Sequence, residues 1–275
     1  MNPAIRDKPI GIFDSGMGGL TVMKSLMKLL PHEALIYLGD TARLPYGTKS
    51  ADTVKRYAVQ CARALLRYDI KMLVVACNTA SANALSDLSN ALAPTPVIGV
   101  IEPGAEAAVA AAPEGRIAVL ATEGTVKGGA YVRAIHARNP RTQVIQKACP
   151  LFVPLAEEGI TKGQIPELVA ALYLDPLLKD LATRPECLVL GCTHFPVLRE
   201  VIARVAGPGS KLVDSADTTA TAVQRLLGET GLLRPAASAT APRFLSTDAP
   251  ERFARVGQIF LGTPIAPESV ELVDL

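Results

Sequence analysis

Two cysteines, Cys77 and Cys192, occupy matching sequence contexts in this chain of 275 residues. Each ends a continuous apolar run, in KMLVVACNTAS (71–81) and ECLVLGCTHFP (186–196), and each is followed by short polar side chains. Such a run is typical of a buried parallel strand, and ligands of open α/β sheets gather beyond the carboxyl ends of these strands. Both thiols are therefore expected at a binding site.

Two thiols that face one small substrate suit racemisation, because one group must remove a proton from a stereogenic carbon while the other returns a proton from the opposite side. An unperturbed cysteine has a pKa of about 8.5, so a thiolate and a thiol can coexist near working pH. A lone cysteine after a strand is more often a core residue, and disulfide exchange usually joins sulfurs that lie close together. The paired, equivalent positions favour a two-base reaction.

Each thiol also needs a neighbour that can shift its proton. His194 lies two residues after Cys192 and is the candidate on that side, while Asp14 ends the first predicted strand and is the candidate on the Cys77 side. The alternatives are a satisfied imidazole packed against its neighbours and an aspartate that only caps the next helix. Spacing alone favours Glu157 as a solvated charge at a helix end, with a cleft-facing carboxylate as the alternative.

A duplicated α/β unit would bring the two thiols together. Strands are predicted at 9–13 (PIGIF) and 116–120 (RIAVL), an offset of 107 residues that roughly matches the cysteine offset of 115. Thr122 and Thr125 follow the second strand, where Asp14 and Ser15 follow the first.

A glycine-rich turn, DSGMGGL (14–20), connects the first strand to an amphipathic helix. The N–H groups of such a turn suit an anion. A dinucleotide site is disfavoured, because the turn matches neither GxGxxG nor GxxxxGK[ST] and its aspartate would repel a pyrophosphate.

These elements predict an α/β fold of two pseudo-symmetric domains with mostly parallel sheets and the active site in the cleft between them. Residues 1–97 together with 209–275 are expected to form a discontinuous first domain, and residues 98–208 the second, because the last elements need a sheet to join. A strand is expected to end near Glu102, and a helix over 164–182 to be interrupted near Pro176.

Composition excludes several classes of protein. The formal net charge is +2 with scattered basic residues, and aromatic residues make up 4% of the chain, so we expect no nucleic-acid partner. No apolar run approaches the length of a membrane span, and no signal-like segment precedes the first strand. We therefore expect no association with a membrane and a cytoplasmic location. The odd number of cysteines, five, and the lack of a CxxC pair predict reduced thiols and no metal site.

The residues together closely resemble the glutamate racemases of the aspartate/glutamate racemase superfamily. The motifs that carry the resemblance occur in the family's order and spacing over most of the chain: IGIFDSGMGGLTV, GDTARLPYG, VVACNTASA, VIGVIEPG, EGTV, PLAEEG, VLGCTHFP and LVDSA. KGGAY (127–131) departs from the pattern, since many relatives carry a serine after the lysine.

The resemblance implies cofactor-independent interconversion of L- and D-glutamate, which supplies D-glutamate for peptidoglycan, cell-wall biogenesis and cell shape. Cys77 and Cys192 would be the catalytic acid/bases, serving D- and L-glutamate respectively, with Asp14 assisting the first, His194 the second and Glu157 as an auxiliary. The implied substrate contacts are Asp14, Ser15, Tyr46, Gly47, Asn78, Thr79, Thr125, Thr193 and His194.

The resemblance also implies a homodimer and raises DNA gyrase as a secondary binding partner, as in some glutamate racemases. Two other functions stay open from the sequence. One is a racemase of the same superfamily acting on aspartate or another small acid, and the other is a non-catalytic amino-acid sensor.

Overall fold

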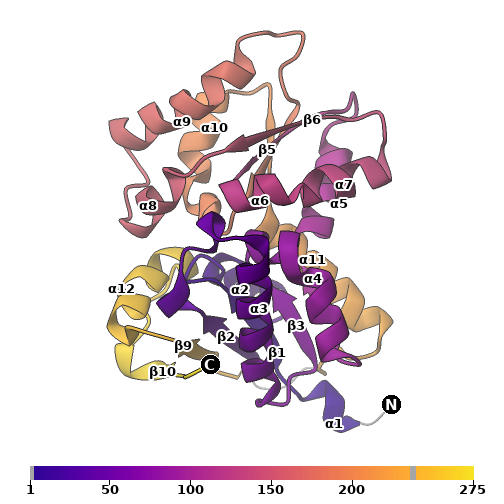
Figure 1. The fold of residues 1–275 in the computed structure, drawn as a ribbon, viewed down its shortest axis with the longest axis vertical. Coiled ribbons are helices and arrows are strands. Elements are labelled where there is room, and N and C mark those ends of the chain that lie inside the picture. Colours follow the sequence, from indigo (N-terminus) through magenta and orange to yellow (C-terminus); the bar gives the residue numbers. More distant parts are fainter. Residues whose placement is uncertain (1–2, 236–239) are drawn as a thin grey trace.

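A computed structural model describes residues 3–235 and 240–275 and arranges them as two stacked α/β units (Figure 1). Each unit is built on a parallel sheet. Among the described residues, the larger sheet runs β10 (Val270–Leu272), β9 (Arg243–Ser246), β2 (Leu35–Gly39), β1 (Ile10–Asp14), β3 (Met72–Val75), β4 (Val97–Gly99), and the smaller sheet runs β6 (Gln143–Ala148), β5 (Arg116–Ala121), β7 (Cys187–Gly191), β8 (Lys211–Asp214).

The order β2-β1-β3-β4 matches β6-β5-β7-β8 position for position. In both units the strand that leads to a cysteine, β3 or β7, pairs with the first strand of its unit. The expected α/β fold class with parallel sheets is therefore confirmed.

Two helical layers bury the larger sheet. On one face, α3 (Ala51–Leu66) and α4 (Asn78–Leu92) pack together over Phe13 and Leu38. On the other face, α2 (Leu20–Leu29), α11 (Ser215–Glu229) and α12 (Pro250–Leu261) cover Ile10 and Ile12. Because β1, β2 and β3 are buried at every residue, they are the continuous apolar runs expected of central parallel strands.

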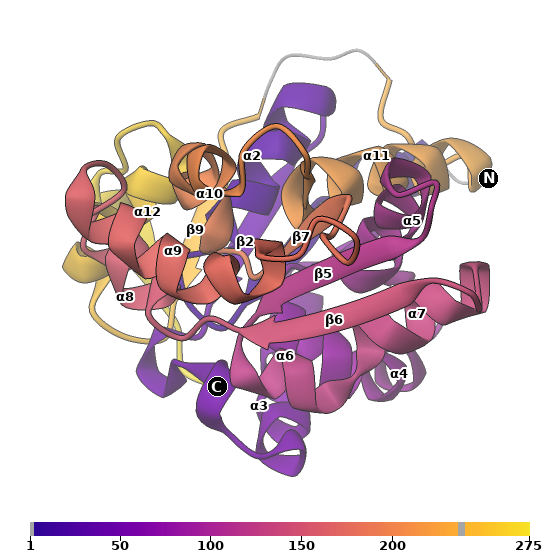
Figure 2. The same ribbon diagram turned by 90° about the horizontal axis from the view of Figure 1, so that it is seen from above.

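The smaller unit lies above the larger unit in Figure 1 and in front of it in Figure 2. One helix, α5 (Ile101–Ala111), packs against β7 and β8, and β6 forms a partly exposed edge. The remaining elements of the described chain are α1 (Pro3–Arg6), α6 (Glu123–Gly128), α7 (Ala130–Arg138), α8 (Phe152–Glu157), α9 (Gln164–Leu178), α10 (Arg199–Ala206) and the short 3₁₀ segments η1 (Thr41–Arg43), η2 (Tyr46–Thr48), η3 (Phe195–Leu198), η4 (Pro267–Ser269).

The chain crosses between the units at two places that differ from the expected boundaries. β4 still pairs with β3, so the first crossing comes after Gly99 rather than after residue 97. β8 pairs with β7, so the start of the returning segment at residue 209 was wrong. Asp214 ends β8 and caps α11 by accepting N–H groups of Ala216 and Asp217, both at 3.1 Å, and α11 then packs on both α5 and α2. The return therefore runs along α11, and the division into two domains stays a prediction.

Two local expectations were also wrong, and one element was missed. The strand expected to end near Glu102 ends at Gly99, and Glu102 lies in the first turn of α5. The helix α9 is not interrupted, because Pro176 lies in its last turn and the carbonyl that loses a partner belongs to the exposed Leu172. The short edge strand β10 was not predicted.

No helix in residues 3–235 and 240–275 combines the length and the apolar character that a membrane crossing requires.

Candidate active site

A cavity of about 200 Å³ opens between the two units, where β1, β3 and β7 end. It is smaller than the roughly 300–1,000 Å³ pockets of drug-sized ligands, which suits a small metabolite. Asp14, Thr125 and Glu157 are absent from the described residues that line it. Those residues are Ser15, Pro45, Tyr46, Gly47, Thr48, Cys77, Asn78, Thr79, Thr122, Glu123, Pro150, Val153, Pro154, Cys192, Thr193 and His194.

Cys77 reaches this cavity from the end of β3 and forms the N-cap of α4. Its sulfur accepts the backbone N–H of Ala80 at 3.4 Å, and its thiol donates to the hydroxyl of Ser15 at 3.5 Å. Burial, reinforced by the nearby charge of Asp14, raises the pKa of Cys77 to about 12. Cys77 is therefore a neutral thiol at physiological pH.

Asp14 is fully buried behind the cavity wall. Its carboxylate accepts the N–H of Gly16 at 3.1 Å and the hydroxyl of Thr193 at 3.5 Å. Burial raises the pKa of Asp14, while the charge of His194 and backbone N–H groups oppose that shift. Gly19, rather than Asp14, stands at the N-cap of α2. Asp14 thus acts on Cys77 through its charge and on the glycine-rich turn through its hydrogen bonds.

Cys192 follows β7 and is paired with an imidazole. The Cys192 sulfur lies 3.8 Å from Nδ1 of His194, and Nε2 of the same ring lies 3.2 Å from Oε1 of Glu157. The other oxygen of Glu157 accepts a hydrogen bond of 2.8 Å from Nη2 of Arg252. Glu157 is largely buried, whereas its neighbour Glu158 is exposed, so the solvated-charge interpretation of Glu157 was wrong.

Cys192, His194 and Glu157 form a chain of contacts, here called the Cys192 relay. The contacts of His194 and Glu157 determine whether these two groups are charged. Burial alone would lower the pKa of His194, but hydrogen bonds to Cys192 and Glu157 raise it to about 10. Burial likewise acts to raise the pKa of Glu157, and the His194 and Arg252 contacts reverse this and lower it. His194 and Glu157 are therefore both charged near neutral pH, and the positively charged imidazole of His194 lies beside the Cys192 sulfur.

Three threonine hydroxyls meet where the units touch. Thr79 at the start of α4 lies 2.9 Å from Thr122 and 3.2 Å from Thr125, and the last two lie 3.1 Å apart. Thr122 is also the N-cap of α6. Thr125 is fully buried and supports the other two hydroxyls, which line the cavity. Thr122 was not among the predicted contacts, although its place after β5 is the signal that identifies it.

Asn78 is held by side chains of α7 and α11. Its amide oxygen accepts the hydroxyl of the fully buried Tyr131 at 2.8 Å, and its amide nitrogen donates to Ser215 at 3.4 Å. Tyr131 ends the divergent KGGAY segment, in which Gly129 adopts the left-handed conformation (φ 61°) that separates α6 from α7. Gly128 stands where many relatives carry the serine. With glycine at that position, Tyr131 still holds Asn78 at the cavity wall through its hydrogen bond.

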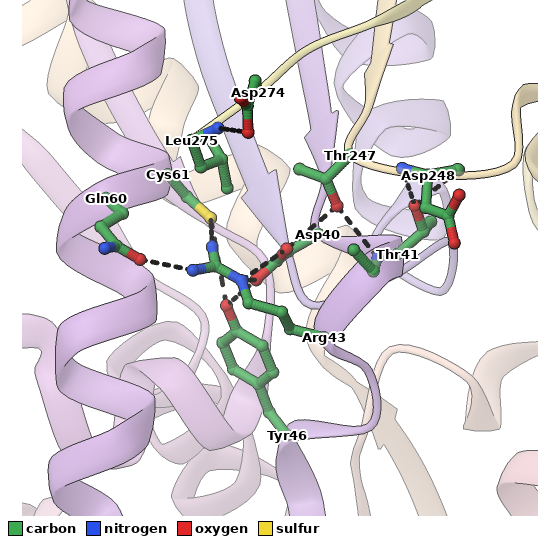
Figure 3. A network of polar contacts seen from close by, with 11 residues as sticks. Asp40, Thr41, Arg43, Tyr46, Gln60, Cys61, Thr247, Asp248, Asp274 and Leu275 are labelled. Carbon is green, nitrogen blue, oxygen red and sulfur yellow. Dashed lines mark hydrogen bonds and ion pairs between the residues drawn. The ribbon is translucent and has the colours of Figure 1, made fainter.

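Tyr46 lies at the cavity wall, but its hydroxyl points away into a buried network (Figure 3). That hydroxyl donates to Asp40, which also accepts Nε of Arg43 at 2.7 Å and the hydroxyl of Thr247 at 3.0 Å. The Arg43 guanidinium stacks 4.2 Å from the ring centroid of Tyr57. The network anchors the 45–48 segment and leaves its outer surface to the cavity.

Two glycines permit close approach between the units. A Cβ on Gly18 would overlap the His194 ring and the Thr193 hydroxyl, and a Cβ on Gly47 would lie 2.8 Å from Cβ of Thr122. Both positions therefore exclude larger side chains.

In the described part of the chain, no three His, Cys, Asp or Glu side chains gather closely enough to hold a metal ion. The expectation of a reaction without metal or cofactor stays a prediction. Pro45, Thr48, Glu123, Pro150, Val153 and Pro154 also line the cavity without having been predicted.

The chain is similar in sequence and in fold to racemases. Residues 10–223 match the family described as Asp/Glu/Hydantoin racemase. A glutamate racemase of Geobacter metallireducens is 52% identical over 93% of both chains. The crystal structure of glutamate racemase from Francisella tularensis in complex with D-glutamate has a TM-score of 0.89 at 39% identity, and that from Thermus thermophilus in complex with beta-chloro-D-alanine has 0.87 at 44%; each comparison covers 98% of both chains. The chain therefore belongs to the Asp/Glu/hydantoin racemase family, among the glutamate racemases.

Proposed function

We propose that this chain interconverts L- and D-glutamate by a two-base reaction without a cofactor, with Cys77 and Cys192 as the acid/base pair. The observation that carries the proposal is that both thiols line one small cavity, each after the equivalent strand of its unit. Membership of the glutamate racemases, which are isomerases, supports both the reaction and the substrate.

The proposed reaction requires opposite protonation states of the two thiols. In the reaction from L-glutamate, the Cys192 thiolate removes the α-proton while the imidazolium of His194 stabilises that thiolate. The neutral Cys77 thiol returns a proton to the opposite side of the carbon. One C–H bond and one S–H bond break, and one of each forms. The product state has the opposite pair of protonation states, which suits the reaction from D-glutamate.

The cavity offers hydrogen-bond donors for the two substrate carboxylates. Hydroxyls of Ser15 and Thr79, the amide of Asn78 and the N-terminus of α4 all lie at its wall. No arginine or lysine is found among its described lining residues. The fixed dipoles of these groups and the positive charge of His194 therefore balance the negative charge of the substrate carboxylates.

The proposed reaction is tested by incubating the purified protein with L-glutamate in deuterium oxide and a metal chelator. We expect optical rotation to fall to zero while one deuterium enters the α-position of each D-glutamate formed. Parallel incubations with L-aspartate test the substrate. Bound glutamate without exchange would favour a sensor, and faster conversion of aspartate would overturn the glutamate assignment.

The proposal extends to the supply of D-glutamate for peptidoglycan in the cytoplasm. Homodimer formation and secondary binding to DNA gyrase come from the family resemblance and stay predictions.

A further inference from the structure

One carboxylate, that of Glu157, joins two basic side chains that come from different units. Its Oε1 lies 3.2 Å from Nε2 of His194 in the smaller unit. Its Oε2 accepts a hydrogen bond of 2.8 Å from Arg252, which lies on α12 against the larger sheet. Each carboxylate oxygen therefore has one partner, and the two partners approach from opposite sides of the boundary.

The helix α12 supports the Cys192 relay at a second point. The His194 and Phe260 rings pack in an edge-to-face arrangement, with ring centroids 5.0 Å apart and an interplanar angle of 73°. α12 also contacts α8, which carries Glu157, and the two helices lie at the same side of the molecule in Figures 1 and 2. A helix from the returning C-terminal segment thus braces the imidazole and its carboxylate partner.

We propose that Arg252 is a positioning residue for the Cys192 half of the reaction, holding Glu157 against His194 from the opposite unit. The inference rests on the proposed function. A glutamate side chain has several rotatable bonds, and only a fixed carboxylate gives the imidazole a constant orientation toward the sulfur. Arg252 supplies the bond that removes this freedom, since its contact with the carboxylate is the shorter of the two.

The pKa of His194 distinguishes positioning from simple charge. The titratable groups facing the ring are Cys192, Glu157 and Asp14. If Glu157 stayed in place after loss of Arg252, the imidazolium would have its carboxylate partner to itself, and the pKa of His194 would rise. If Glu157 moves away, the imidazolium loses an ion pair and the pKa falls. If Arg252 positions Glu157, the pKa of His194 must fall when Arg252 is removed.

The test compares Arg252→Gln, Arg252→Lys and the control Arg225→Gln. Arg225 forms an exposed Arg–Glu pair between α11 and α5, outside the cavity. For each protein, kcat and KM are measured with both enantiomers, and the imidazole pKa values of the three histidines are followed by NMR, with His194 assigned from a His194→Asn variant.

We expect Arg252→Gln to lower kcat by on the order of tenfold with little change in KM, as for other residues that orient a catalytic group. The pKa of His194 falls in the same variant, Arg252→Lys restores most of both properties, and Arg225→Gln matches the wild type. An unchanged kcat, a raised pKa of His194, or an equal loss in Arg225→Gln would overturn the inference. A wild-type protein that does not racemise glutamate would instead overturn the proposed function, and the NMR measurement would still decide the role of Arg252.

Discussion

The two thiols of the cavity are chemically different although their strands are equivalent. Cys77 is bonded to a hydroxyl and a backbone N–H and stands near a buried carboxylate, which favours its neutral form. Cys192 stands beside a positively charged imidazole. The difference arises from the residues that follow each cysteine, because Cys77 is followed directly by the helix α4, whereas His194 stands two residues after Cys192.

The charged imidazole predicts a pH dependence of stability. The pKa of His194 is about 10 in the folded protein against 6.5 when unperturbed, so the folded state binds more protons between these values. This contribution to the free energy of unfolding is fully present below pH 6.5 and is lost as pH rises toward 10. At about 1.4 kcal/mol for each pKa unit between the two values, we expect the free energy of unfolding of the wild type to fall on the order of 5 kcal/mol more than that of His194→Asn over this range, as measured by chemical denaturation.

The control for this measurement is Arg225→Gln, which removes an exposed ion pair on α11 outside the cavity. Arginine stays charged over this pH range, so that variant should keep the wild-type pH slope. If His194→Asn also kept it, the ion pair with Glu157 would contribute nothing to the stability of the folded state.

At the scale of elements, the 45–48 segment carries one wall of the cavity and needs support from both sides. On one side, the Tyr46 hydroxyl anchors the segment to Asp40. On the other side, Gly47 lies directly against Thr122 of the smaller unit. Because Thr122 is a branched side chain fixed as an N-cap, it has little freedom to move aside.

Substitution of Gly47 by alanine should therefore separate the segment from α6. We expect Gly47→Ala to destabilise the protein by about 1–3 kcal/mol, the usual cost of overpacking, and to reduce kcat/KM by at least about tenfold. The matched control is Gly228→Ala on α11, where an added Cβ meets no atom within 4 Å and helix propensity predicts a gain of up to about 1 kcal/mol. Wild-type activity in Gly47→Ala would show that the close contact is dispensable.

Features set by local sequence could be predicted, whereas features set by distant partners could not. The cysteine strands and the placement of His194 follow from apolar runs and the residues directly after them. Glu157 looked solvated because Arg252 lies 95 positions away in sequence. Tyr46 gave no sign that its hydroxyl bonds to Asp40 rather than facing the cavity.

At the scale of the whole molecule, two matching units each supply one thiol to a shared cavity, and the chain crosses between them twice. The second crossing was misplaced because β8 is short and partly exposed, so its sequence did not indicate which sheet it joins. The last strand, β10, is a three-residue edge strand beside β9, too short for its alternation to be read. Sheet membership depends on pairing between distant segments rather than on local pattern.

The division of labour between the units is tested most directly by α-deuterium exchange in the variants Cys77→Ser and Cys192→Ser. Each is incubated in deuterium oxide with L- and with D-glutamate, and exchange is followed together with inversion. We predict that both variants lose at least about 99% of racemisation, the usual contribution of a general acid/base. Cys77→Ser should still exchange the α-proton of L-glutamate alone, and Cys192→Ser that of D-glutamate alone. Full racemisation by either variant, or equal exchange of both enantiomers by one of them, would contradict the two-thiol reaction.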